Sequence, residues 1–227
     1  MDYYTGINNL DKVVFYCDIL YKNGKEEAAD EIFKKYIDEN KDRLNDIENL
    51  NYLFIDNFLA YIYYNGMYVS KDLNKSFQYY KKAADQGSYI AQFNLGEMYN
   101  GGEGVKKDNK LSFDYYKKAA DQGHTDALNR IGHMYYFGQG VEKKYSKALE
   151  YFKKAADQGH IVSQFNVGFM YYNGIGVQKN NLEALKYLKV AAEKGNKEAE
   201  TFINKIDNNM ELEKKFISSA SEGGKSK

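Results

Sequence analysis

The sequence predicts an all-α protein built from stacked pairs of helices. Three observations support this fold class: the chain repeats itself every 36 residues, apolar residues within each repeat recur at helical spacing, and glycines recur where each helix should end. No alternation of β-branched and polar residues, which would be typical of strands, competes with this pattern. A chain of 227 residues that is 43% hydrophobic also has ample apolar material for such a core.

The repeat is marked by the string Lys-Lys-Ala-Ala-Asp-Gln-Gly, which occurs at 81–87, 117–123 and 153–159. A variant of the same string occupies 189–195, and the spacing is 36 residues each time. The four repeats that these strings close occupy 52–87, 88–123, 124–159 and 160–195. The second and third repeats are identical at 16 of 36 positions, which composition alone does not explain. The first repeat is looser, since Ala60 and Tyr68 replace two of the recurring glycines.

The first half of each repeat carries the apolar spacing of a helix. In the second repeat, Ala91, Leu95, Met98 and Tyr99 lie at i, i+4, i+7 and i+8, which is one helical face. Gly96 falls on the same face, where a glycine costs about 1 kcal/mol relative to alanine. Its counterparts in the next two repeats are also glycine. We therefore predict that a second helix crosses there too closely for any side chain.

The second half of each repeat is predicted to be another helix after a tight turn. Gly102 can adopt the left-handed conformation that ends the first helix, and Val105 can pack back against it. The second helix is predicted to begin near Asp108, whose side chain can cap free amides, and Asp72 occupies the same place in the first repeat. Two helices of about 13 residues and two short connections account for the period.

The segment before the repeats, residues 1–51, is predicted to be an atypical helical repeat or cap. A helix pair is expected within 8–38, with a break at Asn23 and Gly24. The segment 45–64 is expected to form one longer helix that merges into the first helix of the first repeat.

The segment after the repeats, residues 196–220, is predicted to form a degenerate repeat with capping helices. It restarts the pattern and then decays into polar residues, as expected where a stack of repeats meets water. A final amphipathic helix is expected over 210–219. Residues 221–227 are small, polar and glycine-rich and are predicted to be a disordered tail.

Composition argues against several classes of partner. Lys plus Arg and Asp plus Glu both total 32, so the zero net charge favours neither nucleic acid nor an anionic membrane. The single cysteine cannot form an intramolecular disulfide, and neither a signal peptide nor a membrane-spanning stretch is visible. We therefore expect a cytoplasmic protein that binds neither nucleic acid nor membranes. The sequence does not determine the oligomeric state, and a monomer is favoured.

No pattern of catalytic or metal-ligating residues stands out. The glycine-rich loop 101–104 lacks the lysine, the hydroxyl residue and the preceding strand of a phosphate-binding loop, so we interpret it as a turn between helices. His124 and His160 occupy the same position in successive repeats, His133 lies elsewhere, and no cysteine or carboxylate cluster accompanies them. We expect the first two to be solvated turn residues. The chain is therefore expected to be no enzyme and to hold no cofactor and no metal.

The repeat motifs resemble the Sel-1-like repeat, a subfamily of the tetratricopeptide solenoids. The resemblance rests on Ala-x3-Leu-Gly-x-Met-Tyr at 91–99, Gly-x-Gly-Val at 102–105 and Tyr-Tyr-Lys-Lys-Ala-Ala-Asp-Gln-Gly at 115–123. It covers 52–195 and, more weakly, 196–207. It implies a right-handed α-solenoid, a superhelix of antiparallel helix pairs whose first helices line a concave surface. It also implies a non-catalytic adaptor that gathers other proteins into complexes.

Two departures from the family pattern bear on function. Some bacterial members carry a cysteine pair in every repeat and were linked to β-lactam binding, whereas the only cysteine here, Cys17, precedes the repeats. Many relatives have tryptophan in the second helix where this chain has tyrosine: Tyr79, Tyr115, Tyr151 and Tyr187. A weak hydrolase or β-lactam-binding protein is therefore a disfavoured alternative. Single-stranded RNA binding by helical-pair repeats is another, because a basic stripe is missing.

The predicted binding site for a peptide, helix or loop of a partner protein is the concave face. If tetratricopeptide geometry transfers, its side chains are offset from Leu95 and its counterparts by −5, −2, +2 and +5 residues. The positions are Phe54, Asn57, Tyr61, Tyr64, Ile90, Phe93, Glu97, Asn100, Asp126, Asn129, His133, Tyr136, Val162, Phe165, Phe169 and Tyr172. The first and last groups of four are rich in aromatic residues, which can anchor a peptide, and polar residues lie between them.

Overall fold

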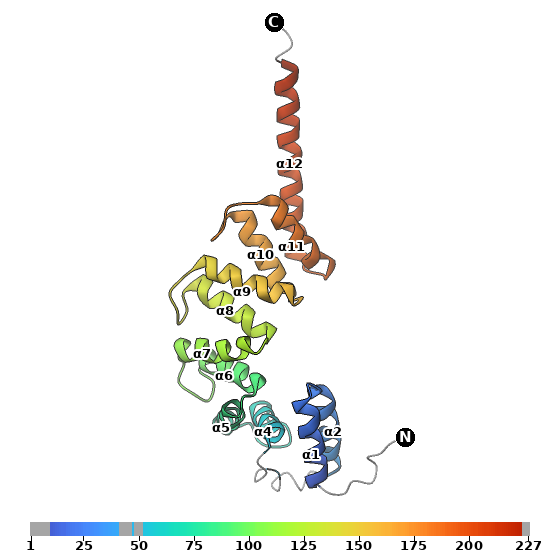
Figure 1. Cartoon of the computed structure of the whole chain (residues 1–227), viewed down its shortest axis with the longest axis vertical. Helices are drawn as coiled ribbons and strands as arrows, with labels where there is room; N and C mark the ends of the chain where they lie inside the picture. Colours follow the sequence, from blue (N-terminus) through green and yellow to red (C-terminus); the bar gives the residue numbers. More distant parts are fainter. Residues whose placement is uncertain (1–9, 41–46, 48–51, 224–227) are drawn as a thin grey trace, which may run out of the picture. The chain divides into compact units, whose positions relative to one another are not determined.

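The structure, a computed structural model, describes residues 10–40, 47 and 52–223 (Figure 1). Within these residues it contains eleven helices and no strand, which confirms the predicted all-α repeat solenoid. In chain order the helices are α1 (Leu10–Lys22), α2 (Glu26–Glu39), α4 (Leu53–Asn65), α5 (Leu73–Asp85), α6 (Tyr89–Gly101), α7 (Asn109–Asp121), α8 (Thr125–Phe137), α9 (Tyr145–Asp157), α10 (Ile161–Asn173), α11 (Asn181–Glu193) and α12 (Lys197–Gly223). They fall into two compact units, Met1–Gln122 and Gly123–Lys227, which we call unit 1 and unit 2.

Each repeat forms two helices of 13 residues, the length that the sequence predicts. The two helices of a repeat pack against each other: α4 with α5 and α6 with α7 in unit 1, and α8 with α9 and α10 with α11 in unit 2. Successive repeats within a unit also pack, α5 against α6 and α9 against α10. None of the described helices combines the length and the apolar character needed to cross a bilayer.

Helix ends follow the local chemistry of the sequence. Asp108 is the N-cap of α7, and its side chain accepts hydrogen bonds from the backbone amides of Lys110 and Leu111, both at 2.9 Å. Asp72 caps α5 in the same way. Gly102 follows α6 in the left-handed conformation, with φ of 74°, and its amide donates to the carbonyl of Met98. These three predicted roles are confirmed.

The recurring glycine of the first helix is explained by a close crossing with the second helix of the same repeat. A Cβ atom on Gly96 would lie 2.5 Å from the ring of Tyr116. The same atom on Gly132 would lie 2.6 Å from the ring of Phe152, and on Gly168 it would lie 2.6 Å from Leu188. Such distances are not tolerated, because protein interiors are already close-packed. The predicted steric reason for the glycine is confirmed.

One pair of stacked tyrosines per repeat joins the end of the first helix to the middle of the second. The ring centroids lie 5.6 to 6.3 Å apart in the four pairs Tyr63–Tyr79, Tyr99–Tyr115, Tyr135–Tyr151 and Tyr171–Tyr187. Aromatic pairs at these distances add to the burial that each ring supplies. Tyrosine therefore fills the position where many relatives carry tryptophan.

The N-terminal helices α1 and α2 pack against the first repeat, and α1 lies beside α4 (Figure 1). Phe33 of α2 meets Phe54 and Phe58 of α4 edge-on, with ring centroids 5.1 and 4.7 Å apart. Tyr52 before α4 has an extended backbone, so the expected single helix over 45–64 is wrong and α4 begins at Leu53. Most of that segment before Tyr52 lies outside the described residues.

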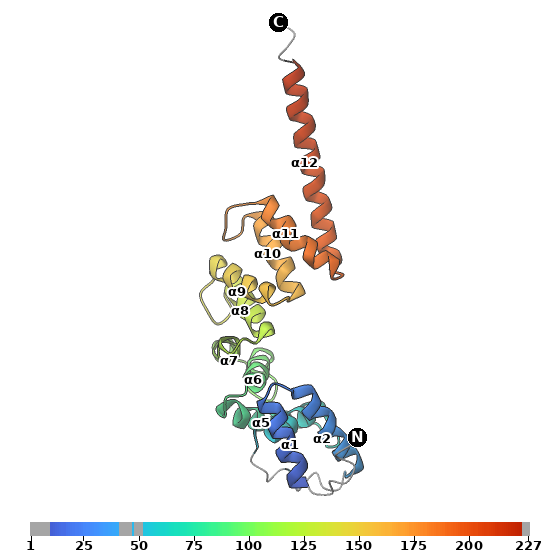
Figure 2. The same cartoon turned by 45° about the vertical axis from the view of Figure 1, so that its right-hand side comes forward.

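The C-terminal segment forms one continuous helix. Residues 210–219 are helical as expected, but they belong to the single helix α12, which runs without interruption to Gly223 and continues past the ends of α10 and α11 (Figure 2). Ala199 and Ile206 are buried against α11. Residues 221–223, which the sequence assigns to a disordered tail, are helical, and 224–227 lie outside the described residues.

A buried carboxylate links the two helices of the first repeat, α4 and α5. The side chain of Asp56 in α4 has no exposed surface, and it accepts hydrogen bonds from Lys82 Nζ at 3.2 Å and from Gln86 Nε2 at 2.8 Å. Both donors belong to the end of α5. In this repeat the Lys-Lys-Ala-Ala-Asp-Gln-Gly string therefore has two roles. It ends helix α5, and its Lys82 and Gln86 are the partners of the buried Asp56 charge.

Candidate functional site

The first helices present the predicted binding residues to different degrees. Phe54 is fully buried in the core between α2 and α4, so its side chain is not available to a partner. Asn57 and Asn129 are also buried, and each accepts a hydrogen bond from a serine hydroxyl, Ser88 and Ser163 respectively. The side chains at these three predicted positions are therefore part of the protein interior and are not exposed for binding. The other thirteen are at least partly exposed.

In unit 1 the accessible predicted residues combine aromatic rings with carboxylates. Tyr61 is 42% exposed. The hydroxyl of Tyr64 donates a hydrogen bond to Glu103, and this bond, followed by burial, raises the pKa of Tyr64 to about 12. The hydroxyl of Tyr116 donates to Glu97 Oε1 at 2.6 Å. Glu97 was predicted from the repeat register, whereas Glu103 lies in the glycine-rich turn and was not.

A small pocket of about 100 Å³ lies in unit 1 beside Tyr61. It collects three predicted positions, Asn57, Tyr61 and Ile90. The full lining is Tyr21, Asp30, Asn57, Phe58, Tyr61, Tyr80, Ile90 and Asn94. Sequence reasoning missed Asp30, because α2 lies outside the repeat and its contacts with α4 have no counterpart in the repeat pattern.

A larger pocket, which we call the His133 pocket, lies in unit 2 and has a volume of about 190 Å³. Four predicted positions meet there, two from α8 and two from α10: His133, Tyr136, Phe165 and Phe169. Four residues that were not predicted complete the lining: Phe137, Phe152, Asn166 and Met170. Phe137 could have been found from the sequence, since the equivalent position in the preceding repeat is Gly101 and an aromatic residue there breaks the pattern.

Aromatic contacts fix the walls of the His133 pocket. The imidazole of His133 stacks on Phe137, with ring centroids 6.1 Å apart and an interplanar angle of 5°. The same imidazole meets Phe152 edge-on at 5.0 Å. Phe137 is 58% exposed, so its ring forms an accessible edge of the pocket. Phe152 is buried and closes the floor.

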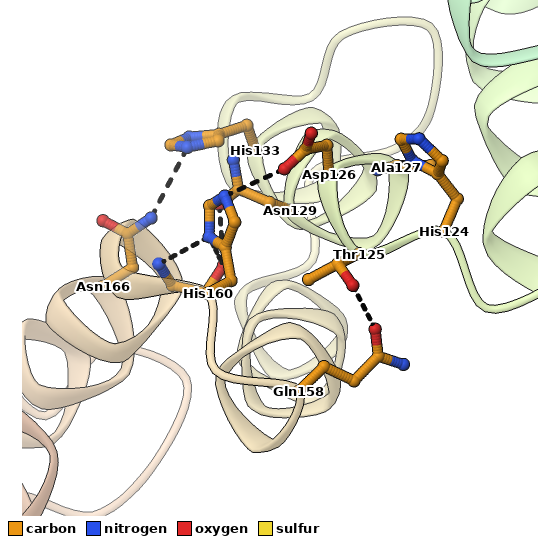
Figure 3. Close-up of polar contacts among 10 residues, drawn as sticks. His124, Thr125, Asp126, Ala127, Asn129, His133, Gln158, His160 and Asn166 are labelled. Atoms are coloured by element: carbon orange, nitrogen blue, oxygen red, sulfur yellow. Dashed lines mark hydrogen bonds and ion pairs between the residues drawn. The ribbon is translucent and has the colours of Figure 1, made fainter. Parts of the chain in front are cut away.

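Two polar groups lie in the wall of this otherwise aromatic pocket. Nε2 of His133 lies 3.5 Å from the side-chain nitrogen of Asn166 (Figure 3). Burial lowers the pKa of His133, and the neighbouring Arg130 and His160 lower it further. The imidazole is therefore neutral at pH 7 and carries one donor and one acceptor nitrogen.

The rest of the fourth repeat is partly covered by the chain itself. Phe202 of α12 contacts the rings of Phe165, Phe169 and Tyr172, with centroids 5.8, 5.5 and 5.4 Å away. Val162, at the start of α10, is 47% exposed. The C-terminal helix thus covers one side of the predicted aromatic surface, and the His133 pocket lies on the side that stays accessible.

The histidines between repeats are helix caps. His160 is the N-cap of α10, and its Nδ1 accepts from the amide of Ser163 at 3.0 Å, while its Nε2 lies 3.3 Å from Asp126 (Figure 3). His124 caps α8 in the same way, through the amide of Ala127. The two were expected to be solvated turn residues, and their partly buried capping role was missed. Asp126 consequently pairs with His160 and does not line the His133 pocket.

Nothing in the described part of the chain is arranged for metal or thiolate chemistry. No group of three or more His, Cys, Asp or Glu side chains in residues 10–40, 47 and 52–223 could hold a metal ion. Cys17 is fully buried, and burial, with Asp30 as a second cause, raises the pKa of its thiol to about 12. Such a thiol stays protonated at neutral pH and is a poor nucleophile.

Comparison with known proteins supports the repeat assignment. The Sel1 repeat matches four consecutive segments, 57–88, 90–124, 125–160 and 161–196, which together make up more than half of the chain. A Sel1 repeat protein from Oxalobacter formigenes is 35% identical and has a TM-score of 0.66, over 85% of this chain and 74% of that chain. The c5321 protein of uropathogenic Escherichia coli, a protective antigen with an SLR fold, is 29% identical and has a TM-score of 0.67, over 84% of this chain and 42% of that chain.

A search of curated protein sequences gave no match. The family assignment therefore rests on the four repeat matches, on the solved structures and on the stacked helix pairs described above. The chain belongs to the Sel1 repeat family.

Proposed function

We propose that this chain is a non-catalytic protein-interaction scaffold that captures a peptide or helix of a partner protein on the faces of its first helices. Sel1 repeat proteins are generally protein-interaction scaffolds. The single observation that carries the proposal for this chain is the His133 pocket, in which side chains of two successive first helices, α8 and α10, meet. We propose that this pocket receives one aromatic side chain of the partner.

The size of the pocket supports a single side chain as its occupant. Pockets for small-molecule ligands and cofactors usually measure about 300–1,000 Å³, well above the 190 Å³ found here. An apolar cavity of about 150 Å³ in another protein accommodates a benzene molecule. A phenyl or indole group of a partner therefore matches the space, and an aromatic residue inserted in a pocket is a typical binding hot spot.

The walls supply both packing and orientation for such an anchor. Phe137, Phe165 and Phe169 offer ring faces and edges to an incoming aromatic group. His133 and Asn166 offer hydrogen-bonding groups that can pair with an indole N–H, a phenol or the backbone of the partner segment. The neutral imidazole adds no charge that would have to be desolvated on binding.

The test uses an aromatic probe and two matched variants of unit 2. Nα-acetyl-tryptophan methylamide is titrated into the full chain, and the side-chain resonances of His133 and Asn166 are followed by NMR. Phe137→Ala removes an exposed wall of the pocket, whereas Leu182→Ala removes a side chain that is 70% exposed on α11, away from the pocket. We expect binding of the wild type and the Leu182 variant and at least fivefold weaker binding of the Phe137 variant.

Two results would contradict the proposal. One is equal binding of the alanine analogue of the probe, since the pocket would then make no distinction between side chains. The other is an unchanged affinity of the Phe137→Ala variant at an unchanged melting temperature. Capture of a partner protein by the wild type, once one is identified, should show the same order among the variants.

A further inference from the structure

Three lysines border the aromatic surface around the His133 pocket in unit 2. All three side chains are exposed, and each places Nζ 4.9 to 5.5 Å from the centroid of an aromatic ring: Lys143 over Tyr145, Lys179 over Tyr172 and Lys205 over Phe202. We call these three lysines the lysine rim. Building on the aromatic anchor proposed above for the His133 pocket, we propose that the partner segment is acidic and that its carboxylates bind to the lysine rim.

The rings beneath the lysine rim contact residues that line the pocket. Tyr145 meets the pocket residue Tyr136 edge-on, with ring centroids 5.1 Å apart. Phe202 meets the pocket residue Phe169 in the same way, at 5.5 Å. The ammonium groups over Tyr145 and Phe202 therefore lie within roughly 10 Å of a pocket wall, a distance that about three residues of an extended chain can span. A segment with its aromatic anchor in the pocket can thus place nearby carboxylates at the rim.

Two of the three lysines have a fixed place at the end of a first helix. Lysine occurs at this position in all four repeats: Lys71, Lys107, Lys143 and Lys179. A Cβ atom on Gly138, which follows α8, would lie 3.1 Å from Cβ of Lys143, and one on Gly174, which follows α10, would lie 3.3 Å from Cβ of Lys179. The stems therefore start from a closely packed backbone, so less freedom is lost when the ammonium groups bind a ligand.

Lys205 belongs to the same surface because α12 begins as the first helix of a fifth repeat would. The side chain of Asn196 accepts a hydrogen bond from the backbone amide of Ala199 at 3.0 Å, in the manner of the residues that cap α8 and α10. In this register Lys205 lies 36 residues after Phe169, which itself lies 36 residues after His133. Both of the earlier residues line the pocket.

The chain does not neutralise the lysine rim. Among the residues that the structure describes, no carboxylate forms an ion pair with any of the three, and this includes Glu142, the sequence neighbour of Lys143. Helix α10 contains no charged residue, and the only carboxylate of α8, Asp126, lies 3.3 Å from Nε2 of His160. An ammonium group has three donors, so a contact with one ring face leaves donors for a partner carboxylate.

The charges that act on the pocket itself have the same sign. Burial lowers the pKa of His133 without indicating a sign, since burial disfavours either charge. The remaining causes are Arg130 and His160, which are both basic, and no carboxylate is among them. A partner carboxylate that approaches His133 is therefore attracted by the charge of Arg130, whereas an ammonium group is repelled.

The experiment measures binding of three pentapeptides to the full chain by NMR, through the side-chain resonances of His133 and Asn166. Each peptide has tryptophan at its centre, flanked on both sides by two Asp, two Asn or two Lys residues, with both ends blocked. At low ionic strength we expect the Asp peptide to bind about tenfold more tightly than the Asn peptide, as several weak ion pairs would give. The preference should shrink at about 0.5 M salt, which screens exposed charges.

The Asn peptide separates this proposal from the proposed pocket function. If the Asn peptide binds and the Asp peptide binds no better, the acidic partner is excluded while the aromatic pocket stands. If neither peptide binds, both proposals are overturned. Binding of the Lys peptide as tight as that of the Asp peptide would also contradict the lysine rim. An oligouridine of the same net charge is the fourth probe, and tighter binding of it than of the Asp peptide would replace a protein partner by nucleic acid.

Substitutions of the lysine rim locate the effect. Methionine keeps an unbranched apolar stem and removes the charge, so Lys143→Met, Lys179→Met and Lys205→Met should each weaken binding of the Asp peptide about twofold to threefold. None should change binding of the Asn peptide. The matched control is Lys186→Met on α11, because Lys186 is exposed and lies over the ring of Tyr187 at 5.8 Å. An equal loss in the control variant would overturn the proposal.

A charge reversal gives a result that loss of folding cannot imitate. Lys205→Glu should weaken binding of the Asp peptide more than Lys205→Met does, and it should strengthen binding of the Lys peptide about twofold to threefold. A gain in affinity requires a folded pocket. Unchanged affinities of this variant for the Asp and Lys peptides would show that the rim does not contact the partner segment.

Discussion

Phe202 of α12 meets Phe169 of α10 edge-on, with ring centroids 5.5 Å apart and an interplanar angle of 86°. Phe169 also lines the His133 pocket, so a residue of the C-terminal helix supports a wall of the proposed binding site from outside. Phe165, another pocket residue, contacts the same ring. The last repeat is thereby covered by an aromatic cluster, to which α12 contributes Phe202 and α10 contributes Phe165 and Phe169.

Replacing Phe202 by alanine should lower the free energy of unfolding by about 2 kcal/mol, less than for a fully buried phenylalanine because its ring is only partly buried. Urea denaturation of the variant measures this change. Leu212→Ala is the control on the same helix, since Leu212 is 64% exposed, and it should be nearly neutral. Equal stability of the two variants would show that the Phe202 cluster does not hold α12 in place.

Replacing Gly96 by alanine should destabilise the protein by about 1–3 kcal/mol, because the new Cβ atom would lie 2.5 Å from the ring of Tyr116. The control is Gly101→Ala at the end of the same helix, where the nearest atom is the flexible side chain of Glu103 at 3.2 Å. That change should be neutral or slightly stabilising, since alanine has the higher helix propensity. Thermal unfolding separates the two outcomes. A stabilised Gly96 variant would mean that the helices can move apart without cost.

Replacing Lys82 by methionine should destabilise the protein by about 2 kcal/mol, because it removes the cation that pairs with the buried carboxylate of Asp56 at 3.2 Å. Lys81→Met, the same change at the neighbouring exposed lysine, is the control and should cost little. Chemical denaturation at pH 7 measures both. The prediction fails if the two variants lose the same stability.

Stability should fall as the pH drops below about 6.5, the ordinary pKa of histidine. Burial lowers the pKa of both His124 and His160 in the folded protein, although Asp126 opposes the shift in each, and Arg130 adds to it at His160. The unfolded chain therefore binds protons that the folded chain does not, and protonation favours unfolding. Protonation of His160 at Nδ1 would also remove the acceptor that caps α10.

The double variant His124→Ser and His160→Ser tests this pH dependence. Serine does not titrate in this range, and Ser88 already caps α6 at the equivalent position of the second repeat. We expect a smaller difference between the melting temperatures at pH 7 and pH 5 for the variant than for the wild type. The same difference in both proteins would place the acid sensitivity elsewhere in the chain.

Much of the fold was predictable because its causes are local and periodic. The caps Asp72 and Asp108, the left-handed Gly102 and the crossing at Gly96 each depend on residues of a single repeat, and the period of 36 residues shows them several times over. The family resemblance follows from the same positions. What failed lies at the ends: the single helix expected over 45–64 and the disordered tail expected over 221–227, of which 221–223 are helical.

The candidate sites were predictable only in part. The repeat register places His133, Tyr136, Phe165 and Phe169 on the first helices, and the structure brings these four into one pocket. The register gives no information on which side chains the caps cover. Phe54 occupies the same register position as residues that stay accessible, yet it is buried because Phe33 of α2 packs on it.

The sequence by itself therefore determined the class of fold, the helix ends at Asp72, Gly102 and Asp108, the steric need for glycine and the family. Only the tertiary structure decided that Phe54 is core, that Asp30 joins Tyr61 in a pocket and that Phe202 lies against Phe169. The physical reason is the range of the forces concerned. Hydrogen bonding and sterics within a repeat act between residues close in sequence, whereas burial of an aromatic ring depends on whichever distant segment excludes water from it.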